Sequence, residues 1–106
     1  MAARDDTLLT DDDREQARGV FPEWTVGETE MRRSYEASSF LAGVEIVRRV
    51  AEAAEDRDHH PDIDIRWRTV TFTLSTHSAG GLTGKDTDLA GVIDEQITAD
   101  GQATGA

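Results

Sequence analysis

Apolar residues recur along this chain with two different spacings, and the spacing separates predicted helices from predicted strands. The clearest helical series follows steps of mostly three and four, and consists of Phe40, Leu41, Val44, Val47, Ala51 and Ala54. Such a series is typical of a helix with one apolar face. Ser38 or Ser39 can cap its beginning. The polar stretch from Glu55 to Asp58 and Pro61 close it, because proline disfavours helical geometry in the residue before it.

Alternation with a period of two dominates the segment that follows. Ile63, Ile65 and Trp67 alternate with charged residues, and Val70, Phe72 and Leu74 then alternate with hydroxyl residues, as expected of strands with one apolar face. The parity changes between Trp67 and Val70. This change predicts either a bulge or two strands that meet near Arg68 and Thr69. Trp24 to Val26 and Glu30 to Ala37 also suit strands, with a turn near Gly27.

Two further helices are predicted near the ends of the chain. Thr10 can cap a short helix together with Asp13, and this helix runs to about Arg18. Thr83 and Asp86 fit a second helix start, which is followed by an apolar series at helical spacing, namely Leu89, Ala90, Ile93 and Ile97. We therefore expect a domain over residues 10–97, with flexible tails at residues 1–9 and 98–106.

This order of elements predicts an α+β fold, a two-layer sandwich. Its mainly antiparallel sheet, four-stranded if the segment from Ile63 to Leu74 forms two strands, carries helices packed on one face. The other face of the sheet would be polar. An exposed edge strand could pair with a second subunit.

Composition narrows the class of protein and its partners. The 106 residues suit one domain. A chain this small, without cysteines, has a thin core, which favours self-association. Its 11 basic and 22 acidic residues give a net charge of −11, which disfavours nucleic acid and membrane surfaces as partners. There is no apolar run long enough to span a bilayer and no signal core at Met1, so we expect a soluble, cytoplasmic protein.

Candidate chemistry centres on three histidines at element ends. His59 and His60 come just before a predicted strand, and His77 comes just after one. Imidazole gains or loses a proton near neutral pH, so such a group suits general acid and base catalysis. Glu55 and Asp58 could orient a ring, or be solvated at a helix end. A zinc site is the weaker interpretation, because adjacent residues tend to point apart and the spacing of zinc-binding helices is absent. Packed or solvated histidines remain the structural alternative.

The segment from Glu55 to Ala90 as a whole resembles the pterin-4a-carbinolamine dehydratase family. The resemblance rests on Asp58-His59-His60-Pro61, on Thr76-His77 after an alternating strand, and on Gly80-Gly81-Leu82-Thr83 with Asp86. It extends more weakly upstream, through Trp24 and Tyr35 to the helix from Phe40.

The resemblance implies a β-β-α-β-β-α core that forms a homodimer or homotetramer. It also implies removal of water from a 4a-hydroxytetrahydropterin to give the quinonoid dihydropterin, in recycling of a tetrahydrobiopterin-type cofactor. No metal or organic cofactor is implied. The three histidines, His59, His60 and His77, match catalytic positions. Substrate-binding candidates are Glu55, Asp58, Pro61, Trp67, Thr76 and Asp86.

Trp67 and Ile63 are two residues near the predicted histidine site whose roles are less direct. Periodicity makes Trp67 most simply a core or interface residue, although it could stack on a flat heterocycle. Ile63 stands where animal members of the family have a tryptophan, which affects how the outer edge of the pterin is contacted.

We expect His60 and His77 to share the acid and base roles while His59 positions the departing hydroxyl; which ring is acid and which is base stays open. The rival hypothesis is a non-catalytic dimerisation or assembly module with the same fold, since some members of the family serve a transcription factor as dimerisation partners.

Overall fold

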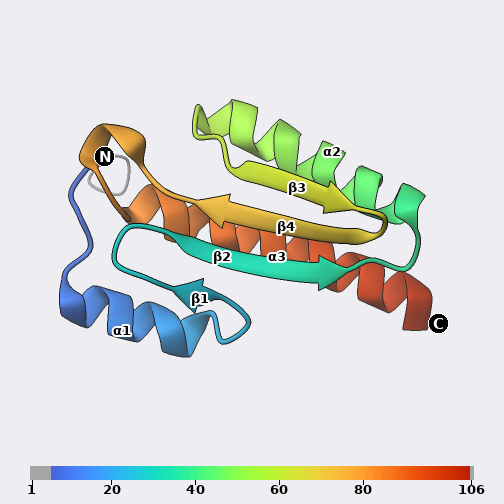
Figure 1. The fold of residues 1–106 in the computed structure, drawn as a ribbon, viewed down its shortest axis with the longest axis horizontal. Coiled ribbons are helices and arrows are strands. Elements are labelled where there is room, and N and C mark those ends of the chain that lie inside the picture. The colour runs from blue at the N-terminus through green and yellow to red at the C-terminus, as the bar shows by residue number, and fades with distance from the viewer. Residues whose placement is uncertain (1–5, 106) are drawn as a thin grey trace.

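The computed structural model describes residues 6–105, and the side chains of residues 6–101 (Figure 1). Along the chain the elements are α1 (Asp11–Val20), β1 (Thr25–Val26), β2 (Met31–Glu36), α2 (Phe40–Arg57), β3 (Asp62–Arg66), β4 (Thr69–Leu74), the short 3-10 helix η2 (His77–Ala79) and α3 (Gly84–Gly105). The helices and strands expected from the spacing are therefore all present, with small shifts at their ends.

The four strands form one antiparallel sheet in the order β1-β2-β4-β3. In Figure 1, α3 runs behind β2 and β4, α2 runs along the β3 side, and α1 lies beside β1. Alternation along β4 places its apolar residues in the core between sheet and helices, where Val70, Phe72 and Leu74 are fully buried. The expected α+β fold with a four-stranded antiparallel sheet is confirmed.

The parity change near Trp67 comes from a tight hairpin between two separate strands. Arg66 of β3 pairs with Thr69 of β4, so only Trp67 and Arg68 form the turn. Trp67 has a φ of 58°, the left-handed conformation that the first position of such a two-residue turn requires. The choice between a bulge and two strands is thus settled in favour of two strands.

Helical structure and hydrogen bonds extend into both segments that we expected to be tails. Helix α3 continues past Thr98 as far as Gly105, and the Asp100 carboxylate accepts hydrogen bonds from the Tyr35 hydroxyl at 2.7 Å and the Ser38 hydroxyl at 2.8 Å. Near the N-terminus, the Leu9 amide donates to the Leu82 carbonyl at 2.8 Å. Secondary structure and hydrogen bonds therefore reach beyond the expected domain bounds of 10–97 at both ends, and the flexibility of the tails stays a prediction. Residues 1–5 and 106 lie outside the described residues.

Within residues 6–105, none of the helices combines the length and the apolar character needed to cross a membrane. The cytoplasmic location stays a prediction.

Candidate active site

His59 owes its buried position to the way helix α2 ends. Asp58 adopts the left-handed conformation with φ 49°. The His59 amide then donates to the Ala54 carbonyl at 3.1 Å, and the Asp58 amide donates to Glu55 at 3.2 Å. This is the Schellman pattern, in which the residue after the left-handed one usually packs back against the helix. Here an imidazole takes that place, and His59 is only 9% exposed.

A buried carboxylate holds the His59 ring. His59 Nε2 lies 2.6 Å from Asp86 Oδ1, and Asp86 on the first turn of α3 is fully buried. The other oxygen, Oδ2, accepts hydrogen bonds from the Thr76 hydroxyl at 2.8 Å and the Thr83 amide at 2.9 Å. Asp86 therefore joins the end of α2, the end of β4 and the start of α3 at one point.

The hydrogen-bond partners show how the donors and acceptors of this network are arranged. With an ionised Asp86, which only accepts hydrogen bonds, His59 Nε2 is the donor of this contact, and a neutral ring would then carry its lone pair on Nδ1. Thr76 gives its one hydroxyl hydrogen to Asp86, so the Thr83 hydroxyl, 2.8 Å away, donates to Thr76. The Lys85 amide in turn donates to Thr83 Oγ1 at 3.2 Å. The contact with Asp86 thus fixes the position of the His59 ring.

His60 is held differently and faces solvent. Its Nε2 atom lies 2.6 Å from Glu55 Oε2, and both side chains are more than half exposed. Glu55 sits on the last turn of α2, so the helix end and the following residues form a local pair. Glu55 thus contacts an imidazole ring and is at the same time solvated at a helix end, and its role in orienting the ring stays a prediction.

His77 lies at the same end of the β3–β4 hairpin as the other two histidines. It directly follows Thr76, whose hydroxyl shares Asp86 with His59. A pair of backbone hydrogen bonds between Thr76 and Gly81 closes the loop that carries it, at 2.9 and 3.3 Å. Gly80 makes this closure possible because it adopts a φ of 77°. The His77 side chain is exposed at the surface of that loop.

The remaining predicted residues divide between the two ends of the hairpin. Pro61 is half-buried between His60 and the start of β3, and Asp58 is exposed beside His59. Trp67 lies in the turn at the opposite end of β3, where it is 75% exposed and the Arg68 guanidinium stacks over its ring at 5.2 Å. Since β3 separates them, Trp67 does not line the histidine end within its own chain.

A cavity of about 160 Å³ opens beside His59. Its lining consists of Arg57, Asp58, His59, Lys85 and Asp88. Each cation there faces a carboxylate, since Arg57 Nε lies 2.8 Å from Asp88 and Lys85 Nζ lies 2.6 Å from Asp6. Sequence reasoning missed Arg57, Lys85 and Asp88, because only the packing of α2 against α3 brings them to His59. Their closeness to Asp58 and Asp86 in the sequence was the one available signal.

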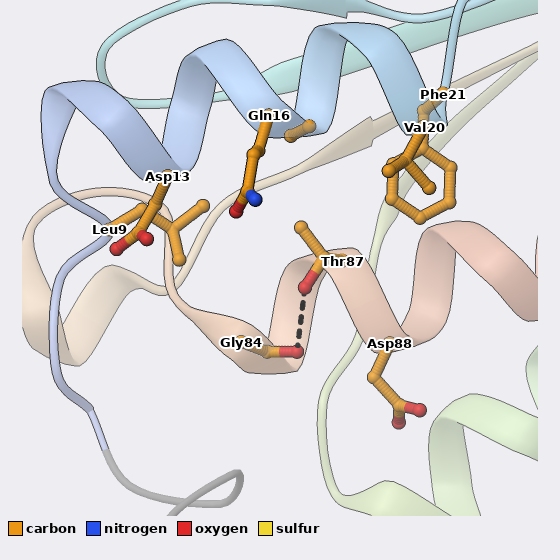
Figure 2. A pocket seen from close by; sticks show the side chains of 9 residues that line it. Leu9, Asp13, Gln16, Val20, Phe21, Gly84, Thr87 and Asp88 are labelled. Atoms are coloured by element: carbon orange, nitrogen blue, oxygen red, sulfur yellow. Dashed lines mark hydrogen bonds between the residues drawn. The ribbon is translucent and has the colours of Figure 1, made fainter.

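A larger hollow of about 520 Å³ lies between α1 and the start of α3. Figure 2 shows Gln16, Val20 and Phe21 on the α1 side and Gly84, Thr87 and Asp88 on the α3 side. Asp88 lines both cavities, but none of the histidines faces the larger one. The Asp13 carboxylate on its rim already accepts the Thr10 amide as part of a helix cap. Size therefore does not select the site: of the three histidines only His59 lines the smaller cavity, and neither His60 nor His77 is among the residues that line either one.

Among the described residues there is no group of three His, Cys, Asp or Glu side chains arranged to hold an ion.

Comparison with known proteins gives the family. The family model described as pterin 4 alpha carbinolamine dehydratase matches residues 7–96. The chain belongs to this dehydratase family. Two bacterial relatives are provisionally named as pterin-4-alpha-carbinolamine dehydratases. The protein of Nocardia farcinica is 61% identical over 88 residues, which are 83% of this chain and 93% of the relative. That of Mycobacteroides abscessus is 58% identical over 90 residues, 85% of this chain and 96% of the relative.

Solved structures share the dehydratase fold. A protein described as a transcriptional coactivator/pterin dehydratase from Brucella melitensis superposes with a TM-score of 0.81 at 27% identity, covering 86% of this chain and 99% of that one. A pterin dehydratase-like protein, described as a RuBisCO assembly factor in the alpha-carboxysome, gives a TM-score of 0.57 at 16% identity over 70% of this chain and 86% of its own. The second likeness shows the fold alone.

Proposed function

We propose that this chain removes water from a 4a-hydroxytetrahydropterin and gives the quinonoid dihydropterin, as recycling of a tetrahydrobiopterin-type cofactor requires. The observation that carries the proposal is the buried His59–Asp86–Thr76 network beside a small cavity, in a member of this family. A histidine kept in one tautomer by a buried carboxylate is costly to build for packing alone, because buried polar groups need every partner satisfied.

The proposed mechanism needs only proton transfer. The 4a-hydroxyl leaves as water when an imidazolium delivers a proton to its oxygen and the C4a–O bond breaks. A neutral imidazole removes the proton of a ring nitrogen, whose electron pair forms the new double bond. We assign these two transfers to His60 and His77, without specifying which is acid. No oxidation or reduction occurs, so no redox cofactor is required.

His59 suits the third role, that of positioning the hydroxyl. In this role an ionised Asp86 keeps the hydrogen on Nε2, and the Nδ1 lone pair accepts a hydrogen bond from the 4a-hydroxyl. Thr76 and Asp86 are 2% and 0% exposed, so we propose that both act through His59 and do not contact substrate. Glu55 likewise acts through His60. Asp58 and Pro61 remain candidates for direct contact.

The charge of the cavity supports a neutral ligand. Its two cations, Arg57 and Lys85, are each paired with a carboxylate. A bound molecule with a net negative charge would have to displace one of these carboxylates. A neutral reduced pterin, with its several ring nitrogens and carbonyl oxygen, does not need to.

The test is dehydration of a synthetic 4a-hydroxytetrahydropterin, measured as the rate above the uncatalysed reaction. His60→Ala and His77→Ala should each lower kcat by about 10² to 10⁴, the usual contribution of a general acid or base. Ser78→Ala, next to His77 on the same loop, is the matched control and should retain the wild-type rate. Near-normal turnover in both histidine variants would refute the proposal.

A second candidate function is a binding module that uses the fold without catalysis. The description of the Brucella melitensis structure as a transcriptional coactivator as well as a dehydratase favours it. The same assay separates the two candidates, because a pure binding module would show no rate above the uncatalysed reaction while remaining folded.

A further inference from the structure

The segment before α1, residues 6–9, forms a strap that is fastened beside the buried histidine network. In Figure 1 it runs from α1 to the loop that carries η2. The Leu9 amide donates to the Leu82 carbonyl at 2.8 Å, and Leu8 forms an antiparallel bridge with Thr83. Since Thr83 belongs to the buried network described above, the strap lies at the same end of the domain as the candidate active site.

The Asp6 carboxylate at the start of the strap accepts from two donors that belong to different elements. Its Oδ2 accepts the Ser78 hydroxyl at 2.6 Å, and its Oδ1 lies 2.6 Å from Lys85 Nζ. Ser78 directly follows His77 in η2, and Lys85 lies on the first turn of α3. The hydrogen bonds from Lys85 and Ser78 lower the pKa of Asp6. An ammonium and a hydroxyl thus converge on one internal anion.

Asp6 also decides the charge at this side of the 160 Å³ cavity. Among the lining residues, Asp58 and Asp88 balance Arg57 and Lys85, and Asp6 adds one further negative charge against Lys85. The side chains of Lys85 and Asp6 are 26% and 40% exposed, so a ligand can reach both. Without this carboxylate, its two donors would lack their acceptor while remaining close enough to bind a single anion.

We propose that Asp6 is a specificity-determining residue. Its carboxylate occupies the position that an anionic group of a ligand would take, and it thereby restricts the cavity to neutral ligands. For a pterin, this favours an uncharged side chain over one that carries a phosphate. That choice of ligand class rests on the proposed function, whereas the exclusion of anions at Lys85 does not.

An anion from solution has to compete with a carboxylate that is already in place. A group tethered by a short segment acts at an effective concentration of about millimolar. Here the backbone contacts of Leu8 and Leu9 keep the strap close to Lys85. An anion that bound beside Asp6 without displacing it would meet a like charge at close range. Both routes are unfavourable for an anionic ligand and leave a neutral one unaffected.

A purely structural latch is the competing explanation of the same contacts. As a latch, Asp6 would only hold the strap, and its replacement would affect neutral and anionic ligands alike. Ion pairs between partly exposed groups contribute little to stability. The specificity role instead predicts a response that depends on the charge of the ligand and on the presence of Lys85.

Inorganic phosphate tests the exclusion of anions without any pterin. The midpoint of thermal unfolding is measured against phosphate concentration at constant ionic strength. Asp6→Asn keeps the size of the side chain and removes its charge. An anion that binds only the folded state raises the midpoint, so phosphate should raise the midpoint of Asp6→Asn by several degrees more than that of the wild type. The double variant Asp6→Asn/Lys85→Gln should lose this gain.

Glu23→Gln is the matched control for the change in net charge. Glu23 is exposed in the loop between α1 and β1 and does not line the cavity beside His59. This variant should respond to phosphate as the wild type does. Equal stabilisation of the wild type and Asp6→Asn, or a gain that persists after Lys85 is replaced, would overturn the proposal.

Two stable pterins test the cavity itself. One carries a hydroxymethyl group and the other carries the phosphate monoester of that group, and the fluorescence of the pterin ring reports the binding of each. In Asp6→Asn the affinity for the ester should rise about five- to thirtyfold, the difference between an ionic and a neutral hydrogen bond, while the affinity for the neutral pterin should stay unchanged. An equal change for both pterins would leave Asp6 only a structural role. If phosphate acts as expected but the wild type does not dehydrate its substrate, the proposed function fails while the exclusion of anions stands.

Discussion

Replacement of Asp86 by asparagine should reverse the tautomer of His59 while the fold survives. Asparagine has nearly the same shape as aspartate, but it offers one oxygen and one NH₂ group. Two donors, the Thr76 hydroxyl and the Thr83 amide, converge on Asp86 Oδ2, so the amide oxygen should take that place. The NH₂ group then faces His59 Nε2 at the 2.6 Å position of Oδ1. Nε2 must accept, and the hydrogen of the ring moves to Nδ1.

The expected losses of stability and activity follow from the hydrogen bonds that Asp86 accepts. Three charge-assisted hydrogen bonds become neutral ones, and since the two kinds differ by about 1 kcal/mol each, the free energy of unfolding should fall by about 2 to 3 kcal/mol. Nδ1 can no longer accept a hydrogen bond from the substrate hydroxyl. We expect kcat/KM to fall about a hundredfold or more, since a catalytic histidine held in the wrong tautomer loses up to about 10⁴ in a serine protease.

Three measurements separate positioning from mere destabilisation. Nitrogen-15 NMR of the histidine rings reads the His59 tautomer, urea unfolding reads stability, and dehydration reads activity. Asp94→Asn is the matched control: Asp94 lies on the same helix and accepts hydrogen bonds from Trp24 Nε1 at 2.8 Å and Arg33 at 2.7 Å. It should lose stability but keep its turnover. An Asp86→Asn protein that retains the Nε2–H tautomer and wild-type activity would show this reasoning to be wrong.

Two further predictions concern stability. Burial and the neighbouring Asp100 carboxylate raise the pKa of Tyr35 from 10 to about 12, so the neutral hydroxyl stabilises the folded state fully below pH 10, and this stabilisation is lost as the pH rises through 12. Tyr35→Phe removes the hydroxyl and should abolish this part of the pH dependence of the free energy of unfolding, measured by urea titration. An unchanged dependence at alkaline pH would contradict the prediction. Thr10→Ala removes the capping box with Asp13 and should cost about 1 kcal/mol, measured by thermal unfolding at neutral pH, where an unchanged midpoint would show that α1 does not need its cap.

The helices and strands could be predicted from local patterns of residue spacing. The three- and four-residue spacing from Phe40 predicted α2, the alternation around Phe72 predicted β4, and Thr10 with Asp13 predicted the start of α1, each of which the structure contains. These signals are readable because the solvent-facing and core-facing sides of a helix or strand repeat with fixed periods. The family and its fold could also be predicted, since His59, His60, Pro61 and His77 occur in a characteristic order.

Such local patterns could not predict contacts between residues that are far apart in the sequence. Thr98 and its neighbours looked like a tail because they are small and polar, yet Asp100 has partners on Tyr35 and Ser38, far earlier in the chain. Trp67 looked by its parity like a core or interface residue, but the turn between β3 and β4 keeps it out of the core of its own chain. Periodicity describes one segment at a time, and it carries no information on where the hairpin reverses.

By itself, then, the sequence determined which segments are helices and strands, which face of each is apolar, and which side chains can carry protons. Only the tertiary structure decided that Asp86, from the start of α3, reaches His59 at the end of α2 and Thr76 at the end of β4. The physical reason is that a buried carboxylate is stable only where several donors converge on it. That convergence depends on how three elements pack, which no local spacing encodes.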